Sequence, residues 1–469
     1  PDDMPAEGTV NSIDLSPNTP GRAVMAVYRY RDDDFRPYVF LTDNFGEDWR
    51  LLTDGENGIP EDHPVRVVRE DPDREGLLYA GTEFGMFVSF DEGENWQSLQ
   101  QNLPRTPITD LRVHRQDLVV ATQGRSFWIL DDVTPLHAVQ DGMRAEALAI
   151  VQPRDAILGR GGRAIEMTYW VGDDPERVQI EVIDASGTVI VDDSGRVQRD
   201  EDEEEDASDE EESEEEAEAE DEEGGQMRGE QPRDANLEEG RLSVSAGMNQ
   251  WSWNLRYPGP DVIPGSQFSL ASTGGAAAPP GRYTIRVTAG DVVEEFEVDA
   301  QLDPNIASVT EADMAAQHEL TMQVRDRLTE VHDAIREIRS IRDQTSGFVR
   351  RARDGEYDEE AVDRLDELAD ALGDTLTAIE EELIQTKSES GQDPINFPPK
   401  LDDQLAYLYS HVNGSYGRPT EGAYQRYDDL MAETQPYLDR LEELVADEVV
   451  AFNAALADAG IGAVVTRRR

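Results

Sequence analysis

The octet Thr42-Asp43-Asn44-Phe45-Gly46-Glu47-Asp48-Trp49 recurs as Ser89-Phe90-Asp91-Glu92-Gly93-Glu94-Asn95-Trp96, and this repeat decides the fold of the N-terminal region. The tryptophans that end the two octets are 47 residues apart. Short β-prone runs surround both octets, and Gly, Pro, Asn and Asp separate these runs. A period of about 40–50 residues made of four short strands is typical of a β-propeller blade.

A third copy of the repeat begins like the second and ends differently. Residues 78–82 correspond to residues 119–123, and residues 86–88 correspond to residues 127–129, but the turn has become Leu130-Asp131-Asp132. About three blades are therefore visible, whereas a propeller needs roughly four to eight blades to close. We expect the remaining blades to precede Pro1 or to come from another chain.

Each octet follows the pattern Ser/Thr-x-Asp/Asn-x-Gly-x-x-Trp, in which every fixed position has a local role. The polar third residue can accept hydrogen bonds from the backbone of its own turn. Glycine permits the positive φ of a tight turn, and tryptophan packs the start of the next strand. We expect all eight residues at these positions to be structural: Thr42, Asn44, Gly46, Trp49, Ser89, Asp91, Gly93 and Trp96.

This octet resembles the Asp-box of bacterial-neuraminidase-repeat propellers, and the resemblance covers about residues 10–135. Families with this box include sialidases, sortilin-like receptors and secreted bacterial proteins labelled glycosyl hydrolase. Asn44 replaces the usual Asp in the first copy, and neither copy has Thr or Ser before its Trp. The resemblance implies the C-terminal part of an exported sortilin-like protein that binds proteins or peptides. The alternative is a sialidase-like, glycan-cleaving hydrolase whose active site lies in blades missing from this chain.

Composition divides the chain into residues 1–140, 141–305 and 306–469. The first part holds the incomplete propeller. In the second part, apolar residues alternate with polar ones in runs such as 178–182 and 283–287, which is typical of an antiparallel β-sandwich. The lead-in to the latter run resembles that of a late strand in an immunoglobulin-like domain. We therefore expect an immunoglobulin-like sandwich to follow the propeller.

An acidic insert at residues 199–240 interrupts the predicted sandwich. Its core, residues 200–223, has 19 acidic residues in 24 and no aromatic or branched apolar residue, which predicts a disordered loop. The insert lacks the ligand spacing of a calcium loop, so we expect diffuse cation attraction rather than a specific site. Of Trp251 and Trp253, we expect one to face the core and the other the surface or a neighbour. Packing is favoured over carbohydrate binding for both.

The third part is predicted to be helical. Thr310-Glu311-Ala312-Asp313 approximates a capping box at a helix start, and apolar residues then recur at alternating steps of three and four. Pro436 lies inside the last helix, where we expect a kink. These repeating apolar residues form seams along residues 324–338, 365–383, 401–412 and 424–456. The seams predict an antiparallel helical bundle, which is either a surface for self-association or a self-contained stalk.

The chain has 469 residues, with 42 basic and 102 acidic side chains, and its net charge is −60. This charge excludes nucleic-acid binding and docking on an anionic membrane. No run of about 20 apolar residues could span a bilayer. Outside residues 200–223 the net charge is still −41, and the basic side chains include only two lysines. We therefore expect a secreted or periplasmic protein from a high-salt organism; an ordinary acidic secreted protein is the alternative.

The sequence contains no catalytic or metal-binding motif. Cysteine is absent, and no HExxH, GxSxG or glycine-rich phosphate loop occurs, so we expect neither a cofactor nor a metal ion. Arg29 and Tyr30, or Arg125, are the residues to consider for sialidase-like roles. Three blades cannot assemble a complete site, so the catalytic residues stay unassigned. The six histidines form no ligand cluster: His63, His114, His137, His318, His332 and His411.

Overall fold

A computed structural model describes residues 4–159, 162–198, 242–355, 357–388, 393, 396–462, 464 and 466. The predicted acidic insert at 199–240 lies outside these residues. The chain forms two compact units. The first contains Pro1–Val151, Thr168–Asp174 and Ala246–Asn249, and the second contains Gln152–Met167, Pro175–Ser245 and Gln250–Arg469. The division into three domains at residues 140 and 305 stays a prediction.

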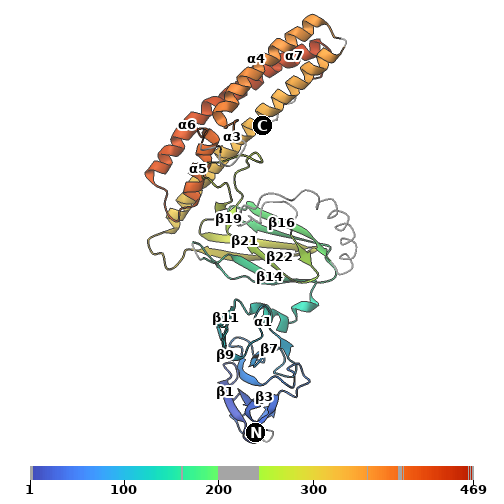
Figure 1. Cartoon of the computed structure of the whole chain (residues 1–469), viewed down its shortest axis with the longest axis vertical. Helices are drawn as coiled ribbons and strands as arrows, with labels where there is room; N and C mark the ends of the chain where they lie inside the picture. Colours follow the sequence, from blue (N-terminus) through green and yellow to red (C-terminus); the bar gives the residue numbers. More distant parts are fainter. Residues whose placement is uncertain are drawn as a thin grey trace. The chain divides into compact units, whose positions relative to one another are not determined.

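The first unit contains three consecutive antiparallel sheets with the strand order expected of blades (Figure 1). The strand that begins each sheet lies beside the first strand of the next sheet. The third sheet has three strands within the described part of the chain, whereas the other two have four. The strands are β1 (Thr9–Leu15), β2 (Ala23–Arg29), β3 (Asp34–Thr42), β4 (Arg50–Leu51), β5 (Val65–Glu70), β6 (Leu78–Thr82), β7 (Met86–Ser89), β8 (Gln97–Ser98), β9 (Ile108–His114), β10 (Asp117–Thr122) and β11 (Phe127–Leu130).

The same repeat positions form the apolar contacts between successive sheets. Val39 and Leu41 of β3 join a buried cluster with the second sheet. Met86 and Val88 of β7 join a buried cluster with the third sheet. Phe127 of β11 occupies the position that Met86 has in the second sheet, yet it is 75% exposed. Within the described residues, the outer side of the third sheet therefore has no covering sheet.

After β11 the first unit continues with a short helix and a further strand. The helical segments are η1 (Tyr30–Asp32), α1 (Thr134–Gln140) and η2 (Met143–Ala145), and the strand is β12 (Leu148–Val151). His137 of α1 is buried against Asp71, whose carboxylate also accepts a hydrogen bond from the Tyr79 hydroxyl. The distances from Asp71 Oδ2 are 3.0 Å to His137 Nε2 and 2.8 Å to Tyr79 Oη. This cluster fixes α1 to the second sheet.

The second unit begins with β structure. A six-stranded sheet has the order β13-β22-β21-β15-β16-β17, and a two-stranded sheet pairs β19 with β20. A further sheet has the order β12-β14-β18, and its residues are divided between the ranges of the first and the second unit. Gly187 and Gly290 have φ values of 86° and 58° and lie in hairpin turns. The bounds are β13 (Ala156–Ile157), β14 (Ile165–Val171), β15 (Arg177–Ile183), β16 (Val189–Gln198), β17 (Val244–Ser245), β18 (Gly247–Trp253), β19 (Arg256–Tyr257), β20 (Ala276–Ala277), β21 (Gly281–Ala289) and β22 (Val292–Gln301). The immunoglobulin-like sandwich stays a prediction.

The expectation that one strand tryptophan faces the core and the other the surface or a neighbour is wrong. Trp251 and Trp253 are 7% and 0% exposed. Side chains two residues apart in a strand point to the same face, so both lie in the core. Their indole N–H groups donate to Asp193 Oδ2 at 2.8 Å and to the Arg256 carbonyl at 2.9 Å.

The C-terminal region is helical, and Figure 1 shows α4 along the long helix α3, with α7 beside α4. The helices are α3 (Glu311–Asp354), α4 (Glu359–Leu383), α5 (Leu401–Asn413), α6 (Glu421–Leu444), the π-helical segment η4 (Val445–Val449) and α7 (Val450–Asp458). The predicted capping box is present, because the Thr310 side chain accepts from the Asp313 N–H and Asp313 accepts from the Thr310 N–H. Helix α6 continues through Pro436. The bundle interpretation stays a prediction.

The loop between β19 and β20 is bound to the helices by backbone N–H groups. The Ile263 N–H donates to His332 Nδ1 at 3.1 Å, and the Ser269 N–H donates to Asp403 Oδ1 at 2.8 Å. Apolar side chains of this loop pack on the same buried cluster as the helical seams. None of the helices in the described part of the chain is long and apolar enough to cross a membrane.

Candidate functional site

The three sheets of the first unit have two chemically different ends. Because neighbouring strands are antiparallel, alternate connections fall at opposite ends of a sheet. The octet end contains the two octets and the turns after the first strands, at residues 16–22, 43–49, 71–77 and 90–96. The hairpin end contains the loops before the first strands and the second hairpins, at residues 30–33, 60–64, 83–85, 104–107 and 123–126.

The polar side chains of the second octet bond within their own turn. Ser89 Oγ accepts from the Gly93 N–H at 2.8 Å and donates to Asp91 Oδ1 at 2.8 Å. Asp91 also accepts from the Asn95 backbone and side chain, each at 2.8 Å. Burial raises the pKa of Asp91, but these hydrogen bonds outweigh it and hold the pKa below its ordinary value.

The first octet repeats this arrangement with asparagine in the third position. Thr42 Oγ1 accepts from the Gly46 N–H at 3.0 Å, and Asn44 Oδ1 accepts from the Asp48 N–H at 2.9 Å. Trp49 packs on the apolar side chains of its own sheet. Trp96 is buried between the first and second sheets. The octets therefore use their side chains inside the turns and between the sheets.

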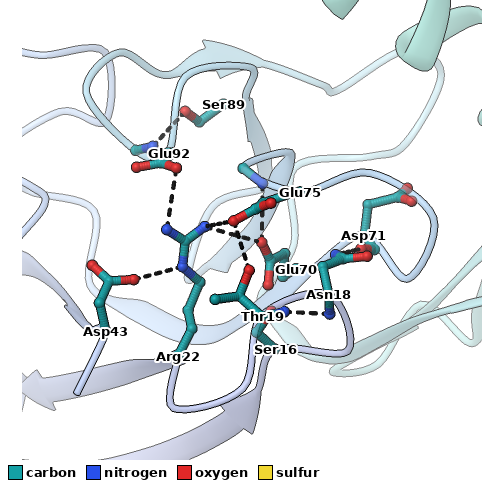
Figure 2. Close-up of polar contacts among 12 residues, drawn as sticks. Ser16, Asn18, Thr19, Arg22, Asp43, Glu70, Asp71, Glu75, Ser89 and Glu92 are labelled. Carbon is teal, nitrogen blue, oxygen red and sulfur yellow. Dashed lines mark hydrogen bonds and ion pairs between the residues drawn. The ribbon is translucent and has the colours of Figure 1, made fainter. Parts of the chain in front are cut away.

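Arg22 joins four turns at the octet end, as Figure 2 shows. Its guanidinium is 2.6 Å from Asp43, 3.1 Å from Glu75, 3.2 Å from Glu92 and 3.7 Å from Glu70. The side chains of Arg22 and Glu70 are 9% and 1% exposed. Burial lowers the pKa of Arg22, but the neighbouring carboxylates outweigh it and raise the pKa above its ordinary value. Arg22 is thus engaged by four carboxylates, of which Glu70 is buried and the other three are about half exposed.

The first strands of the sheets carry a second charged cluster. Arg69 of β5 lies 3.6 Å from Asp14 of β1 and 2.9 Å from Asp110 of β9. Burial raises the pKa of Asp14 above its ordinary value, although Arg69 partly opposes this shift. A single guanidinium therefore links Asp110 to a second carboxyl group, Asp14, whose pKa is raised.

The hairpin end presents aromatic rings and arginines. The Arg105 guanidinium lies over the Phe84 ring, with 4.8 Å between guanidinium carbon and ring centroid. The His63 ring meets the Phe84 ring edge-on, also with 4.8 Å between the ring centroids. His63 Nδ1 is 2.7 Å from Asp62 Oδ1. Phe84 is 37% exposed. We call Arg105, Phe84 and His63 the aromatic stack.

The first sheet adds a second aromatic group at the same end. Tyr28 and Tyr30 are stacked at 4.9 Å, and the Arg31 guanidinium lies 5.9 Å from the Tyr30 ring. Nearby, Asp34 accepts from the Arg36 guanidinium and from the Tyr38 hydroxyl. Burial, together with this bond, raises the pKa of Tyr38 to about 12.

The residues considered for sialidase-like roles have other contacts or are exposed. Arg29 lies 3.8 Å from Asp32 and 3.6 Å from Asp34, and Tyr30 is occupied by its stacking partner. Arg125 belongs to the hairpin between β10 and β11 and is exposed. Among the described residues, no three His, Asp or Glu side chains are placed to hold a metal ion.

The aromatic stack was missed in the sequence because its members come from three separate loops. His63 precedes β5, Phe84 lies between β6 and β7, and Arg105 precedes β9. Aligning the second hairpins of the three repeats would have placed Phe84 at the hairpin end. No sequence signal connects it with Arg105.

No protein-family model matches this chain, and no curated protein matches it. Solved structures show a slight likeness. A GH74 enzyme of Niastella koreensis is 14% identical over 38% of this chain and 29% of its own, with a TM-score of 0.22. A GH74 xyloglucanase of Xanthomonas campestris is 11% identical over 66% of this chain and 40% of its own, with a TM-score of 0.20. An extracellular domain from B. thetaiotaomicron is 10% identical over 63% of this chain and 36% of its own, with a TM-score of 0.19. Such scores support neither a detailed fold nor an activity.

Proposed function

We propose that the hairpin end of the first unit binds a polypeptide segment, as part of an exported, sortilin-like Asp-box propeller protein. The observation that carries the proposal is the aromatic stack, in which a partly exposed Phe84 is held between Arg105 and His63. Aromatic side chains and arginine are enriched in the residues that contribute most to protein interfaces. A preformed stack also loses little side-chain entropy on binding.

The charge of the chain indicates what kind of polypeptide this is. A net charge of −60 attracts basic segments over long distances and repels acidic ones. Among the described residues, the octet end offers no stack of an arginine on an exposed aromatic ring, and its carboxylates Asp43, Glu75 and Glu92 already contact Arg22. A basic peptide with an apolar anchor side chain therefore fits the hairpin end best.

The test is selection of peptides from a random phage-displayed library on the immobilised chain in 1 M KCl. The double variant Phe84→Ala/Arg105→Ala should lose the selected peptides. Phe45→Ala is the matched control, since Phe45 is 85% exposed at the octet end. Peptides that bind parent, double variant and control equally well would refute the assignment of the hairpin end.

A glycan-cleaving hydrolase is the second candidate function. Asp14 supports it, because a partly buried carboxyl group with a raised pKa is suited to act as a general acid. The rest of such a site would lie in blades outside this chain, so we expect this chain alone to hydrolyse no glycan. Incubation with xyloglucan and with sialylated glycans, followed by a reducing-end or sialic-acid assay, tests this. Hydrolysis that disappears in Asp14→Asn would favour the enzyme.

A further inference from the structure

A cavity of about 410 Å³ lies in the helical region of the second unit, far along the chain from the hairpin end. It is bounded by α5, by the start of α6 and by Ser269 of the β19–β20 loop. Its volume lies within the roughly 300–1,000 Å³ that is usual for small-molecule sites. The residues used below are Asp403, Gln404, Tyr407, Leu408, Ala423 and Arg426.

Asp403 gives this cavity a negative wall. The residue is only 5% exposed, and its Oδ1 accepts the Ser269 N–H at 2.8 Å. Among the described residues, no basic side chain forms an ion pair with it. Arg426, which also lines the cavity, is bound to Glu433 at 2.8 Å and to Gln404 at 2.5 Å. A buried carboxylate without a cationic partner carries a desolvation cost that a bound cation would offset.

Tyr407 gives the cavity an aromatic wall beside this carboxylate. Residues four apart on a helix lie on the same face, so Asp403 and Tyr407 of α5 can contact one ligand together. The tyrosine is 55% exposed, and its ring is accessible from the cavity. Leu408 and Ala423 are buried, also line the cavity and give it an apolar surface, its apolar floor. An aromatic face attracts organic cations, and an apolar floor accommodates their alkyl groups.

We propose that this cavity binds a small organic ammonium ion, with Asp403 opposite the charge, Tyr407 against its alkyl groups and Leu408 beneath them. A metal cation fits less well, since the described residues offer no group of three metal ligands here. A neutral apolar molecule would leave the Asp403 carboxylate without a counter-charge. The proposal is independent of peptide binding at the hairpin end.

The test compares choline with 3,3-dimethyl-1-butanol, which has the same shape but carries no charge. Binding is measured by calorimetric titration in 1 M KCl. This salt concentration shortens the Debye length to about 3 Å, so general attraction of cations to the acidic chain is suppressed. We expect choline to bind at least about tenfold more tightly than the alcohol. Asp403→Asn keeps an acceptor for the Ser269 N–H and should weaken choline binding about tenfold.

Asp428→Asn is the matched control, because it removes one exposed carboxylate of α6 that does not line the cavity. It should leave choline binding unchanged, and Tyr407→Ala should weaken it. A cooperative thermal melt checks that each variant is folded. The proposal is overturned if choline and the alcohol bind equally. It is also overturned if a folded Asp403→Asn binds choline like the parent, or if the parent shows no binding at about 10 mM choline.

Discussion

Replacing either member of the buried pair His332 and Asp402 should make the stability of the helical region depend on pH, in opposite directions for the two variants. His332 Nε2 lies 3.9 Å from Asp402 Oδ2, and the side chains are 0% and 4% exposed. Burial lowers the pKa of His332 to about 4 and raises the pKa of Asp402 to about 7. Between these values, the folded pair consists of a neutral imidazole and a protonated carboxyl group.

In the unfolded chain the two groups have ordinary pKa values of 6.5 and 3.8. From pH 4 to pH 6.5 the unfolded pair therefore holds one proton on His332, while the folded pair holds one on Asp402. Equal proton numbers in the two states mean that the pair adds no pH dependence in this window. The cancellation ends when one partner is removed.

Asp402→Asn leaves only His332, whose lowered pKa gives stability that is present above pH 6.5 and lost as the pH falls to 4. At 1.36 kcal/mol per pH unit, the free energy of unfolding should rise by about 3 kcal/mol from pH 4 to pH 6.5, relative to the parent. His332→Gln leaves only Asp402, whose raised pKa makes stability fall as the pH rises. Its change over the same window should be about 3 kcal/mol in the opposite direction.

Urea unfolding followed by circular dichroism at 222 nm, at several pH values in 1 M KCl, measures these differences. The difference in free energy of unfolding between each variant and the parent cancels the contribution of the other carboxylates, and Asp428→Asn controls for the loss of a charge. If the stability difference between Asp402→Asn and the parent does not change with pH, the two groups are not held in their uncharged forms and the reasoning is wrong.

Three further predictions concern stability. Arg22→Ala should destabilise the first unit by about 3–5 kcal/mol, because it leaves Glu70 buried without a counter-charge, whereas Arg50→Ala should cost less than about 1 kcal/mol at its exposed ion pair. Asp91→Ala should cost about 1–2 kcal/mol through its lost turn hydrogen bonds and leave peptide binding at the hairpin end intact. The melting temperature should climb with chloride salt from 0.01 to 3 M, most steeply at low ionic strength, because screening relieves repulsion in a chain of charge −60.

Chemical denaturation of matched variants checks the first two, and a thermal melt checks the third. Equal losses for Arg22→Ala and Arg50→Ala would mean that burial of Glu70 adds nothing. Loss of peptide binding in Asp91→Ala without loss of stability would place the octet in the ligand site. A melting temperature that stays flat with salt would argue against the high-salt interpretation.

The sequence predicted the local architecture well, because periodicity and turn chemistry act over a few residues. The spacing of the octets located the β3–β4 and β7–β8 turns, and the capping box located the start of α3 at Glu311. The one clear error concerned Trp251 and Trp253, where the two-residue period of a strand places both side chains on one face.

The candidate sites could not be predicted in the same way, because they depend on contacts between distant segments. Arg105 meets Phe84 only when the second and third sheets pack together. Asp403 becomes a buried, cavity-lining carboxylate only because Ser269 reaches it from a loop more than 130 residues earlier. In a sequence with 102 acidic residues, nothing local distinguishes such a carboxylate from an exposed one.

The ion pairs of Arg22 also bear on the order in which the first unit folds. Arg22 and Glu92 are 70 residues apart, so their contact closes a long loop and must wait until the second octet has formed. Because the entropy of closing this loop must be paid before the ion pair forms, we expect the contact to form after the folding transition state. Loss of Arg22 should then leave the folding rate nearly unchanged and accelerate unfolding. The ion pairs of Arg22 would therefore act chiefly as a kinetic barrier against separation of the first and second sheets.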